Sequence, residues 1–305
     1  MIDILLATFN GEKYLDTQIS SIVNQSYQDW VLYIHDDGSS DNTIILIQKW
    51  CDLDKRIIFV DDGIVFHNSG DNFMHLLKKS TSEYICFADQ DDYWFDYKLE
   101  KMINAFPKTT SPHLLCTNCY LWDMQSGVTL QHSFFQPKHL KNILFNNGGL
   151  QGCAMMFNAE LRNLVNTALT NDNMRFNMHD FIISLAALTF GKVTYLSDGL
   201  FLYRYHSSTV TIHPAKNRKE YFSNTIKHKK SPVVTQATIE DINSFHQLFS
   251  NRINRKESLT IKKFVSFIKM KPIRRFISIL FSNFSLRNSH LKLMIKILFR
   301  PYYSA

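Results

Sequence analysis

Long apolar runs are missing from this 305-residue sequence. No stretch reaches the roughly 18 uninterrupted apolar residues that a membrane-spanning helix needs, so the sequence predicts no such helix. No basic segment with an apolar core precedes the first strand-like residues, Ile2 to Ala7, and we therefore expect no signal peptide. Internal repeats and low-complexity tracts are missing too.

Cysteine is also scarce, with five residues scattered along the chain. Cys116 and Cys119 form a single CxxC pair, but a zinc site needs two further ligands and no second pair follows. We therefore expect free thiols in a reducing cytosol, not disulfides or a zinc site.

Acidic residues are few in the last third of the chain. Residues 1–213 contain 15 Lys+Arg and 23 Asp+Glu, a net charge of −8, whereas residues 214–305 contain 19 and 4, a net charge of +15. The composition predicts an acidic domain over 1–213 and a basic, mainly helical extension over 214–305. A basic extension suits an anionic partner, and without a recognisable nucleic-acid module we expect no nucleic acid.

Two segments of the extension have the pattern of basic amphipathic helices. Residues 258–270 place Ile261, Phe264, Val265 and Ile268 on one face, and residues 291–299 repeat the arrangement with lysines beside the apolar stripe. Such helices can lie in the interface of an anionic bilayer. They can equally pack on the body with a solvated basic face, and both interpretations remain open.

The body has the composition and the pattern of a folded α/β domain. Hydrophobic residues make up 45% of the chain and aromatic residues 13%, which excludes disorder. Strand-like and helix-like segments alternate over the first ninety residues, which predicts a parallel, doubly wound sheet. The expected strands are 2–7, 30–35, 57–60 and 84–88, and the expected helices are 12–26, about 41–51 and 72–79. Residues 113–122, 153–157 and 193–197 add strands of a mixed sheet, with a helix at about 180–190.

Two acidic clusters follow predicted strands directly. Asp89-Gln90-Asp91-Asp92 comes after the apolar run Tyr84 to Ala88, and Asp36-Asp37-Gly38-Ser39-Ser40-Asp41 comes after Trp30 to His35. Open α/β sheets bind ligands at the carboxyl ends of their strands, so we interpret both clusters as parts of one site rather than solvated turns. Clustered carboxylates there can hold a hard divalent cation, Mn²⁺ or Mg²⁺, against phosphate groups.

A glycine-containing segment follows later in the chain. Gly148-Gly149-Leu150-Gln151-Gly152 offers backbone that a ligand could approach closely, or it is an ordinary loop. The sequence leaves these two interpretations open.

These motifs resemble those of the family 2 glycosyltransferases. The resemblance rests on Ile4 to Leu15, on Asp36 to Asp41 and on Asp89 to Trp94; it is clear over residues 1–105, thinner to about 213 and missing beyond. It implies the GT-A fold: α/β, with a mostly parallel Rossmann-like sheet, helices on both faces and, here, a C-terminal helical extension. The family's activity is transfer of a sugar from a nucleotide diphosphate with inversion at the sugar carbon.

The resemblance also implies roles for single residues. Thr8, Asn10 and Glu12 fall in the first nucleotide-binding loop, and Asp36 matches the aspartate that pairs with a pyrimidine base. The outer positions of the metal-binding DxD motif are Asp89, which also contacts the donor nucleotide, and Asp91, the more direct metal ligand.

Further matches are looser. Asp180 matches the catalytic acidic residue, although capping a helix would equally explain it. His206 matches the histidine that completes the metal site, or it is one of twelve ordinary histidines. The residues expected on the acceptor or sugar side are Trp94, Gly152 and His179, with a place in the core as the alternative for Trp94, and Asp92 orients the loop without touching metal.

The interpretation that follows is a metal-dependent inverting glycosyltransferase. The donor would be a UDP- or dTDP-sugar, with dTDP-rhamnose suggested by the Ala-Asp-Gln-Asp-Asp-Tyr-Trp form of the motif. The acceptor would be a hydroxyl of a lipid-linked oligosaccharide in O-antigen, capsule or other surface polysaccharide synthesis. The protein would be cytoplasmic and peripheral to the inner face of a bacterial cytoplasmic membrane.

Two other functions fit the sequence less well. A non-catalytic scaffold of the same fold, recruiting partners at the membrane, is disfavoured by the carboxylates at 89, 91 and 180. Nucleotidyl transfer normally uses a Gly/Lys/Arg-rich phosphate loop, which Thr8-Phe9-Asn10-Gly11 is not.

Overall fold

The N-terminal half of the central sheet is parallel. The structure, a computed structural model, describes residues 1–123, 127–169, 176–205 and 230–303. Strand β1 pairs in parallel with β2 on one side and with β4 on the other, and β3 pairs in parallel with β2. The central strands β1 and β4 are buried on both faces, as strands of a covered parallel sheet must be, whereas Ile58 of the edge strand β3 is exposed. The strands are β1 (Ile2–Thr8), β2 (Trp30–Asp36), β3 (Ile57–Phe59) and β4 (Tyr84–Ala88).

The other half of the sheet is mixed. Strand β8 lies between β4 and β6 and runs antiparallel to both, whereas β6 and β9 pair in parallel. The full order is β3-β2-β1-β4-β8-β6-β9-β5, with β7 paired to β6. The strands are β5 (Tyr93–Trp94), β6 (His113–Asp123), β7 (Gly127–His132), β8 (Met155–Asn158) and β9 (Lys192–Tyr205). The prediction of a parallel start and a mixed continuation is confirmed, but β9 is one long strand where the sequence predicts only 193–197.

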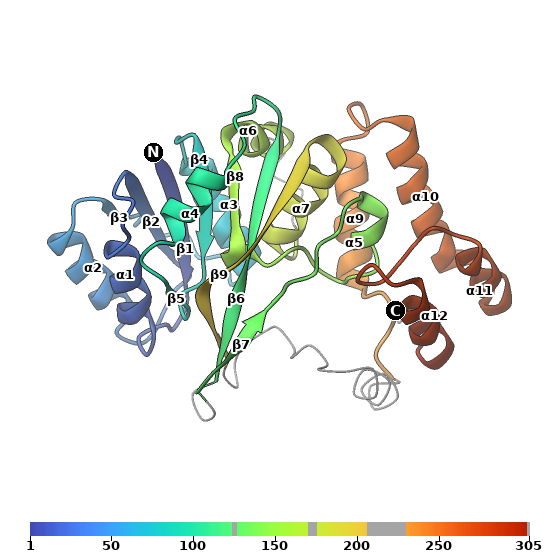
Figure 1. Ribbon diagram of the computed structural model, residues 1–305, viewed down its shortest axis with the longest axis horizontal. Coiled ribbons are helices and arrows are strands. Elements are labelled where there is room, and N and C mark those ends of the chain that lie inside the picture. The colour runs from blue at the N-terminus through green and yellow to red at the C-terminus, as the bar shows by residue number, and fades with distance from the viewer. Residues whose placement is uncertain (124–126, 170–175, 206–229, 304–305) are drawn as a thin grey trace.

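Helices cover both faces of the sheet, as predicted for a doubly wound domain (Figure 1). One face carries α1 (Leu15–Val23), α2 (Thr43–Leu53) and α4 (Lys98–Ala105), whose apolar side chains form one core with Ile2, Ile4 and Leu6. The opposite face carries α3 (Ser69–Lys79), α6 (Ala159–Ala168) and α7 (His179–Phe190), which pack around Leu5, Ile85 and Phe87. Helix α7 is buried from His179 to Ala187, because its sequence is apolar on nearly all sides.

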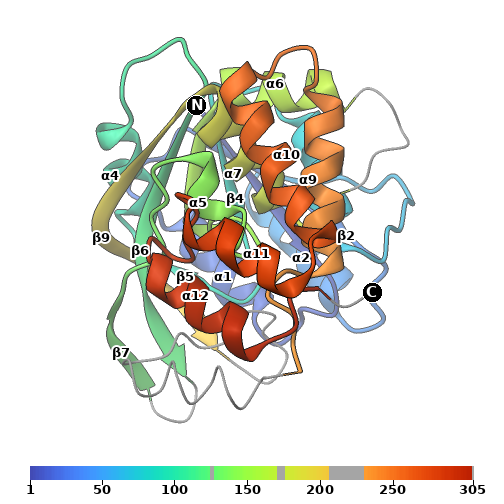
Figure 2. The same cartoon turned by 90° about the vertical axis from the view of Figure 1, so that its right-hand side faces the viewer.

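The C-terminal helices pack outside α7 and complete this second core (Figures 1 and 2). Phe249 of the extension lies 5.0 Å, ring to ring, from Phe190, and Phe264 lies 4.9 Å from Phe145. The helices are α9 (Gln236–Leu248), α10 (Arg255–Lys269), α11 (Pro272–Leu280) and α12 (His290–Phe299), with the short α5 (Leu140–Ile143) between them and the sheet. For α10 the packed interpretation is therefore correct, since Ile261 and Phe264 are buried. The predicted domain boundary at 213/214 lies outside the described residues.

None of the helices in the described ranges is long and apolar enough to cross a bilayer. The thiols of all five cysteines are free, as expected.

Candidate active site

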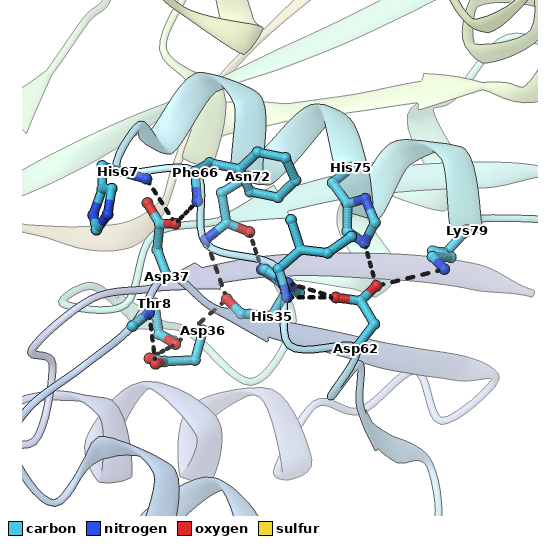
Figure 3. Close-up of polar contacts among 12 residues, drawn as sticks. Thr8, His35, Asp36, Asp37, Asp62, Phe66, His67, Asn72, His75 and Lys79 are labelled. Carbon is cyan, nitrogen blue, oxygen red and sulfur yellow. Dashed lines mark hydrogen bonds and ion pairs between the residues drawn. The ribbon is translucent and has the colours of Figure 1, made fainter. Parts of the chain in front are cut away.

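The carboxyl ends of β1 and β2 lie side by side and hold the first two loops together. The Thr8 hydroxyl donates a 2.8 Å hydrogen bond to the Asp36 carboxylate (Figure 3). The same carboxylate accepts from the Ser39 hydroxyl at 2.6 Å and from the backbone amides of Gly38 and Ser39 at 3.1 and 2.7 Å. Gly38 has a φ of +85°, a left-handed conformation that suits glycine. Asp36 is thus an acceptor held in place by donors, and it is 8% exposed.

The side chains of Asn10 and Glu12 fasten the first loop to the second. The Asn10 side-chain carbonyl accepts from the Ser40 amide at 2.9 Å, and the Glu12 carboxylate accepts from the backbone and side chain of Asn42 at 2.9 and 2.8 Å. Asn10 and Glu12, which were expected to bind nucleotide, thus join the loop after β1 to the loop after β2 through their side chains.

The acidic loop after β4 is tied to the first loop through Gln90. Its side-chain amide pairs with the backbone of Phe9 in both directions, at 2.9 and 3.0 Å. A Cβ on Gly11 would lie 2.5 Å from the Gln90 side-chain oxygen, so the glycine allows this close approach. The three loops thereby form one continuous rim at the carboxyl edge of the sheet.

Carboxylates crowd the end of this loop. Ligand atoms of Asp89, Asp92 and Cys153 lie within 4.8 Å of one another. Burial, and then the charge on Asp91, raises the pKa of Asp89 well above its usual range. Burial, and then the charges of Asp89 and Asp91, raise the pKa of Asp92 well above its usual range too, and one Asp92 oxygen has no hydrogen-bond partner within the described chain.

Two cations that the sequence did not single out lie beneath these carboxylates. Lys98 is fully buried, donates a 2.7 Å hydrogen bond to the Cys153 carbonyl and lies 3.7 Å from the Trp94 ring centre. Burial lowers the pKa of Lys98 to about 8, while Asp92 and Asp89 oppose that shift. Arg204 donates from its side chain to the Asp91 carbonyl at 2.7 Å and from its backbone to Asp92 at 3.2 Å. These contacts fix the backbone and side chains of the acidic loop.

The residues at this edge fit a divalent cation. The half-buried Asp89 and the buried Asp92 both have raised pKa values, and one Asp92 oxygen lacks a donor among the described residues. With Asp91 they form an acidic cluster that one lysine and one arginine only partly balance. Hard oxygen ligands at the end of a strand suit Mg²⁺ or Mn²⁺. The cluster differs from the predicted one: it groups Asp89 with Asp92, which was expected only to orient the loop, and it does not include Asp91, the expected direct ligand. The metal role of Asp91 stays a prediction, and His206 lies outside the described residues.

Helix α7 brings the remaining candidates to the same centre. Asp180 is buried, one of its carboxylate oxygens has no partner in the described part of the chain, and burial followed by the charge on Asp89 raises its pKa to about 7. A Cβ on Gly152 would lie 3.6 Å from the Asp180 Cβ, and a ligand atom of the next residue, Cys153, lies within 4.8 Å of one of Asp89, so α7 and the loop after β4 approach the same short segment. Asp180 does not cap α7, because the N-cap residue is Met178.

The glycine loop packs directly against the start of α7. A Cβ on Gly149 would lie 2.5 Å from the Asp180 backbone, and a Cβ on Gly152 would lie 2.8 Å from the His179 ring nitrogen Nε2. His179 stacks on Phe73 at 3.9 Å between ring centres, and burial lowers its pKa to about 3, so its imidazole is neutral. Gly152, His179 and Asp180 thus lie together.

Trp94 does not join them. Its side chain is 1% exposed and packs in the core on the opposite face of the sheet, with Leu99 and Phe201. The prediction that Trp94 contacts the acceptor is therefore wrong. The structure shows the alternative, in which Trp94 is part of the core. The physical reason is the alternation of side chains along β5, which directs Tyr93 outward and Trp94 into the core.

Comparisons with known proteins also indicate a glycosyltransferase. The model of the family described as Glycosyl transferase family 2 matches residues 3–204. The chain is 34% identical over 119 residues to the dTDP-rhamnosyl transferase RfbG of Shigella flexneri, covering 38% of this chain and 39% of that protein. It is 25% identical over 214 residues to WfgD of Escherichia coli, a UDP-Glc:alpha-D-GlcNAc-diphosphoundecaprenol beta-1,3-glucosyltransferase, covering 70% of this chain and 79% of WfgD. The chain thus matches about two fifths of the length of RfbG.

The fold has solved counterparts as well. The crystal structure of S. aureus TarS 1-349 in complex with UDP-GlcNAc superposes with a TM-score of 0.55 at 16% identity, covering 97% of this chain and 88% of that one. The architecture is that of the GT-A glycosyltransferases, as predicted. The match across two thirds of the sequence, together with this fold, establishes that the chain belongs to glycosyl transferase family 2.

Proposed function

We propose that this protein is a metal-dependent, inverting glycosyltransferase that moves a sugar from a UDP- or dTDP-linked donor to a hydroxyl of a lipid-linked glycan. One observation carries the proposal: a buried Asp180 carboxylate, with an oxygen that has no partner among the described residues, lies within electrostatic reach of Asp89. An acceptor hydroxyl placed between the start of α7 and the loop after β4 would have the base Asp180 on one side and the donor on the other.

Asp180 is proposed as the base that removes the acceptor proton. A carboxylate with a pKa of about 7 is a stronger base than an ordinary one and is still substantially ionised at neutral pH. Inversion requires a single displacement, with the base and the departing diphosphate on opposite sides of the sugar carbon. The packing of Gly149 and Gly152 against α7 holds the Asp180 side chain in a fixed position.

The first two loops are proposed to hold the donor nucleoside. The Asp36 carboxylate is a hydrogen-bond acceptor, and a pyrimidine imide N–H is a suitable donor to it, with the Thr8 or Ser39 hydroxyl turning away to free a lone pair. Thr8, Asn10 and Glu12 keep the loop pair in place. TarS forms a complex with UDP-GlcNAc and RfbG is a dTDP-rhamnosyl transferase, and both UDP and dTDP carry such an imide.

Asp89 and Asp91 are proposed to bind the cation and the diphosphate end of the donor, with His206 as a candidate third ligand. A bound Mn²⁺ or Mg²⁺ would stabilise the charge that develops on the leaving diphosphate. Lys98 and Arg204 hold the acidic loop in its shape whether or not the cation is present.

The acceptor proposal rests on the relatives. WfgD acts on a sugar linked to diphosphoundecaprenol, and RfbG is a rhamnosyl transferase, so we propose a role in synthesis of a surface polysaccharide such as O-antigen or capsule. Gly152 is proposed to border the sugar being transferred, whereas His179, which is 4% exposed and packs on Phe73 and Phe87, supports the Gly152 backbone from the core. The protein would then work at the inner face of the cytoplasmic membrane, where lipid-linked acceptors are available.

Helices α11 and α12 are proposed to touch that membrane. They leave large apolar side chains in solvent: Ile273 is 77% exposed, Phe281 beyond the end of α11 82%, Leu291 66% and Leu298 62%. The basic residues around them are Lys269, Lys271, Arg274, Lys292 and Arg300. Exposed apolar side chains among lysines and arginines suit an anionic bilayer surface.

Donor choice is tested by measuring release of free nucleotide from a panel of UDP- and dTDP-sugars with Mn²⁺. The proposal predicts metal-dependent release from at least one sugar, lost in Asp91→Ala. If no sugar of the panel is turned over even with a lipid-linked acceptor present, the non-catalytic scaffold becomes the better interpretation.

The membrane contact is tested by sedimentation with vesicles that contain phosphatidylglycerol. The double variant Ile273→Ser/Phe281→Ser should stay in the supernatant while the wild-type protein pellets. Ile45→Ser/Leu53→Ser is the matched control, because these α2 side chains are 63% and 66% exposed at the far side of the molecule. Equal pelleting of both double variants would show that α11 does not bind the bilayer.

A further inference from the structure

A second cluster of metal-ligating side chains lies next to Asp36 and Asp37 (Figure 3). His35 comes from β2, Asp62 from the loop after β3 and His75 from α3. The two oxygens of Asp62 face the two imidazoles: His35 Nε2 lies 3.3 Å from one, and His75 Nε2 lies 2.7 Å from the other. The imidazole rings lie 5.0 Å apart, centre to centre. Neither the family match nor the resemblances assign a role to this cluster.

Asn72 fixes the His35 ring. The Asn72 side-chain nitrogen faces the His35 backbone carbonyl at 3.3 Å, so its oxygen is the atom that lies 2.8 Å from His35 Nδ1. His35 Nδ1 must therefore carry a proton and donate to Asn72. A neutral His35 then has its lone pair on Nε2, aimed at the Asp62 carboxylate.

A lone pair that faces a carboxylate oxygen at 3.3 Å is repelled unless a positive charge lies between them. A proton on His35 would supply that charge, and so would a metal ion. A metal-binding histidine usually donates from one ring nitrogen to an oxygen, as His35 Nδ1 does to Asn72, and this contact orients the other nitrogen toward the metal.

We propose that His35, Asp62 and His75 bind a divalent transition-metal ion of the zinc class. Such ions bind imidazole nitrogen and carboxylate oxygen at about 2.0–2.2 Å, which separates neighbouring ligand atoms by about 3.4 Å in a tetrahedral site. The His35 contact to Asp62 already has that length, the His75 contact is shorter, and all three ligand atoms lie within 4.8 Å. Small side-chain movements would thus suffice, with water as the fourth ligand.

The surroundings suit an ion that enters from solvent. His35 is buried, whereas the side chains of Asp62 and His75 are 27% and 15% exposed. Phe66 covers the cluster, 5.7 Å from the His35 ring and 5.3 Å from the His75 ring. Lys79, one turn after His75, is the other charged group that faces Asp62, at 3.7 Å, and its ammonium would compete with the metal.

The ion would stabilise the segment 62–68, which packs against the loop after β2. Asp37 accepts hydrogen bonds from the backbone of Phe66, His67 and Asn68, and a Cβ on Gly38 would lie 3.1 Å from the Val65 side chain. The segment that follows Asp62 therefore lies across the turn that contains Asp36. Joining Asp62 to β2 and α3 through one ion would fasten this segment at its start.

Zinc binding to the full chain tests the proposal by isothermal titration calorimetry. Titrations are run in the Asp91→Ala background, so that the proposed catalytic metal site contributes little and contributes equally to every variant. The added variants are His75→Ala, Asp62→Asn and Lys79→Met, with His246→Gln on α9 as the control for loss of an unrelated histidine. Thermal unfolding with and without Zn²⁺ gives a second readout, because binding to the folded state raises the unfolding temperature.

His75→Ala and Asp62→Asn should each weaken Zn²⁺ binding by at least about tenfold, and the rise in unfolding temperature on adding Zn²⁺ should disappear. His246→Gln should bind as its parent does. Lys79→Met should bind more tightly, since it removes the competing cation. Unchanged affinity in His75→Ala, or weaker affinity in Lys79→Met, would show that the cluster is only a hydrogen-bonded ion pair and would overturn the proposal.

Discussion

Replacing Asp180 with asparagine should stop sugar transfer and, at the same time, stabilise the protein at alkaline pH. Asp180 is buried with an oxygen that has no partner in the described residues, and burial together with Asp89 raises its pKa from 3.8 to about 7. Asparagine has nearly the same shape but cannot ionise. The variant therefore removes both the proposed base and the free-energy cost of a buried charge.

The magnitude follows from the pKa shift. One pKa unit corresponds to about 1.4 kcal/mol, so a shift of about three units means that ionised Asp180 costs the folded state about 4 kcal/mol above pH 7. Because the carboxyl pKa is higher in the folded state than in the unfolded chain, ionisation of Asp180 destabilises the fold. The folded protein keeps the proton that the unfolded chain loses near pH 4, so its stability falls as the pH rises from about 4 to about 7.

Urea unfolding of the wild-type protein and Asp180→Asn at several pH values measures this effect. The free energy of unfolding of the variant, relative to wild type, should increase by up to about 4 kcal/mol between pH 4 and pH 8. For the exposed control Asp198→Asn, the difference from wild type should stay nearly constant over the same pH range. Wild-type turnover should rise with pH through about 7, because the base must be deprotonated. A stability difference that does not change with pH would refute the pKa argument, and normal turnover by Asp180→Asn would refute its role as base.

Three other variants probe the same centre. Asp91→Ala should abolish turnover and leave the circular dichroism spectrum and unfolding temperature near wild type; activity that persists in EDTA would contradict a metal role. Lys98→Met should lower stability by about 1–3 kcal/mol without metal, as measured by urea unfolding, because it leaves the Cys153 carbonyl without its donor and removes a positive charge near Asp92 and Asp89. Mn²⁺ should recover part of that loss, and a stable metal-free variant would contradict the electrostatic role of Lys98. Gly149→Ala should cost about 1–3 kcal/mol and reduce kcat, since its Cβ would lie 2.5 Å from the Asp180 backbone; wild-type values for both would show that the loop gives way freely.

The parts of the site that the sequence predicts are those fixed by local pattern. Asp36 and Asp89 each follow an apolar run, and parallel pairing of β2 and β4 with β1 places the ends of such runs at one edge. The same logic predicts the doubly wound first half of the fold. It also predicts α10, whose apolar stripe at helical spacing packs on the body.

The parts that it does not predict depend on contacts between distant segments. Lys98 at the start of α4 has the sequence context of a solvated residue, and its burial comes from Trp94, Cys153 and Phe201, two of which lie far along the chain. The cluster of His35, Asp62 and His75 has no recognisable spacing, because its members come from a strand, a loop and a helix. Helix α6 is not among the predicted elements, although Asn158 accepts from the Leu161 amide as a helix cap and its preference for that position is a usable signal.

The central claim is that Asp89 and Asp91 bind a cation that holds the diphosphate of the donor. Anomalous scattering from crystals of the full chain soaked with Mn²⁺ and UDP tests it most directly. The account predicts a manganese peak bonded to the Asp91 carboxylate and to both phosphates of the nucleotide, near Asp89. Bound UDP with no manganese at these carboxylates, or manganese and UDP at different places, would contradict it.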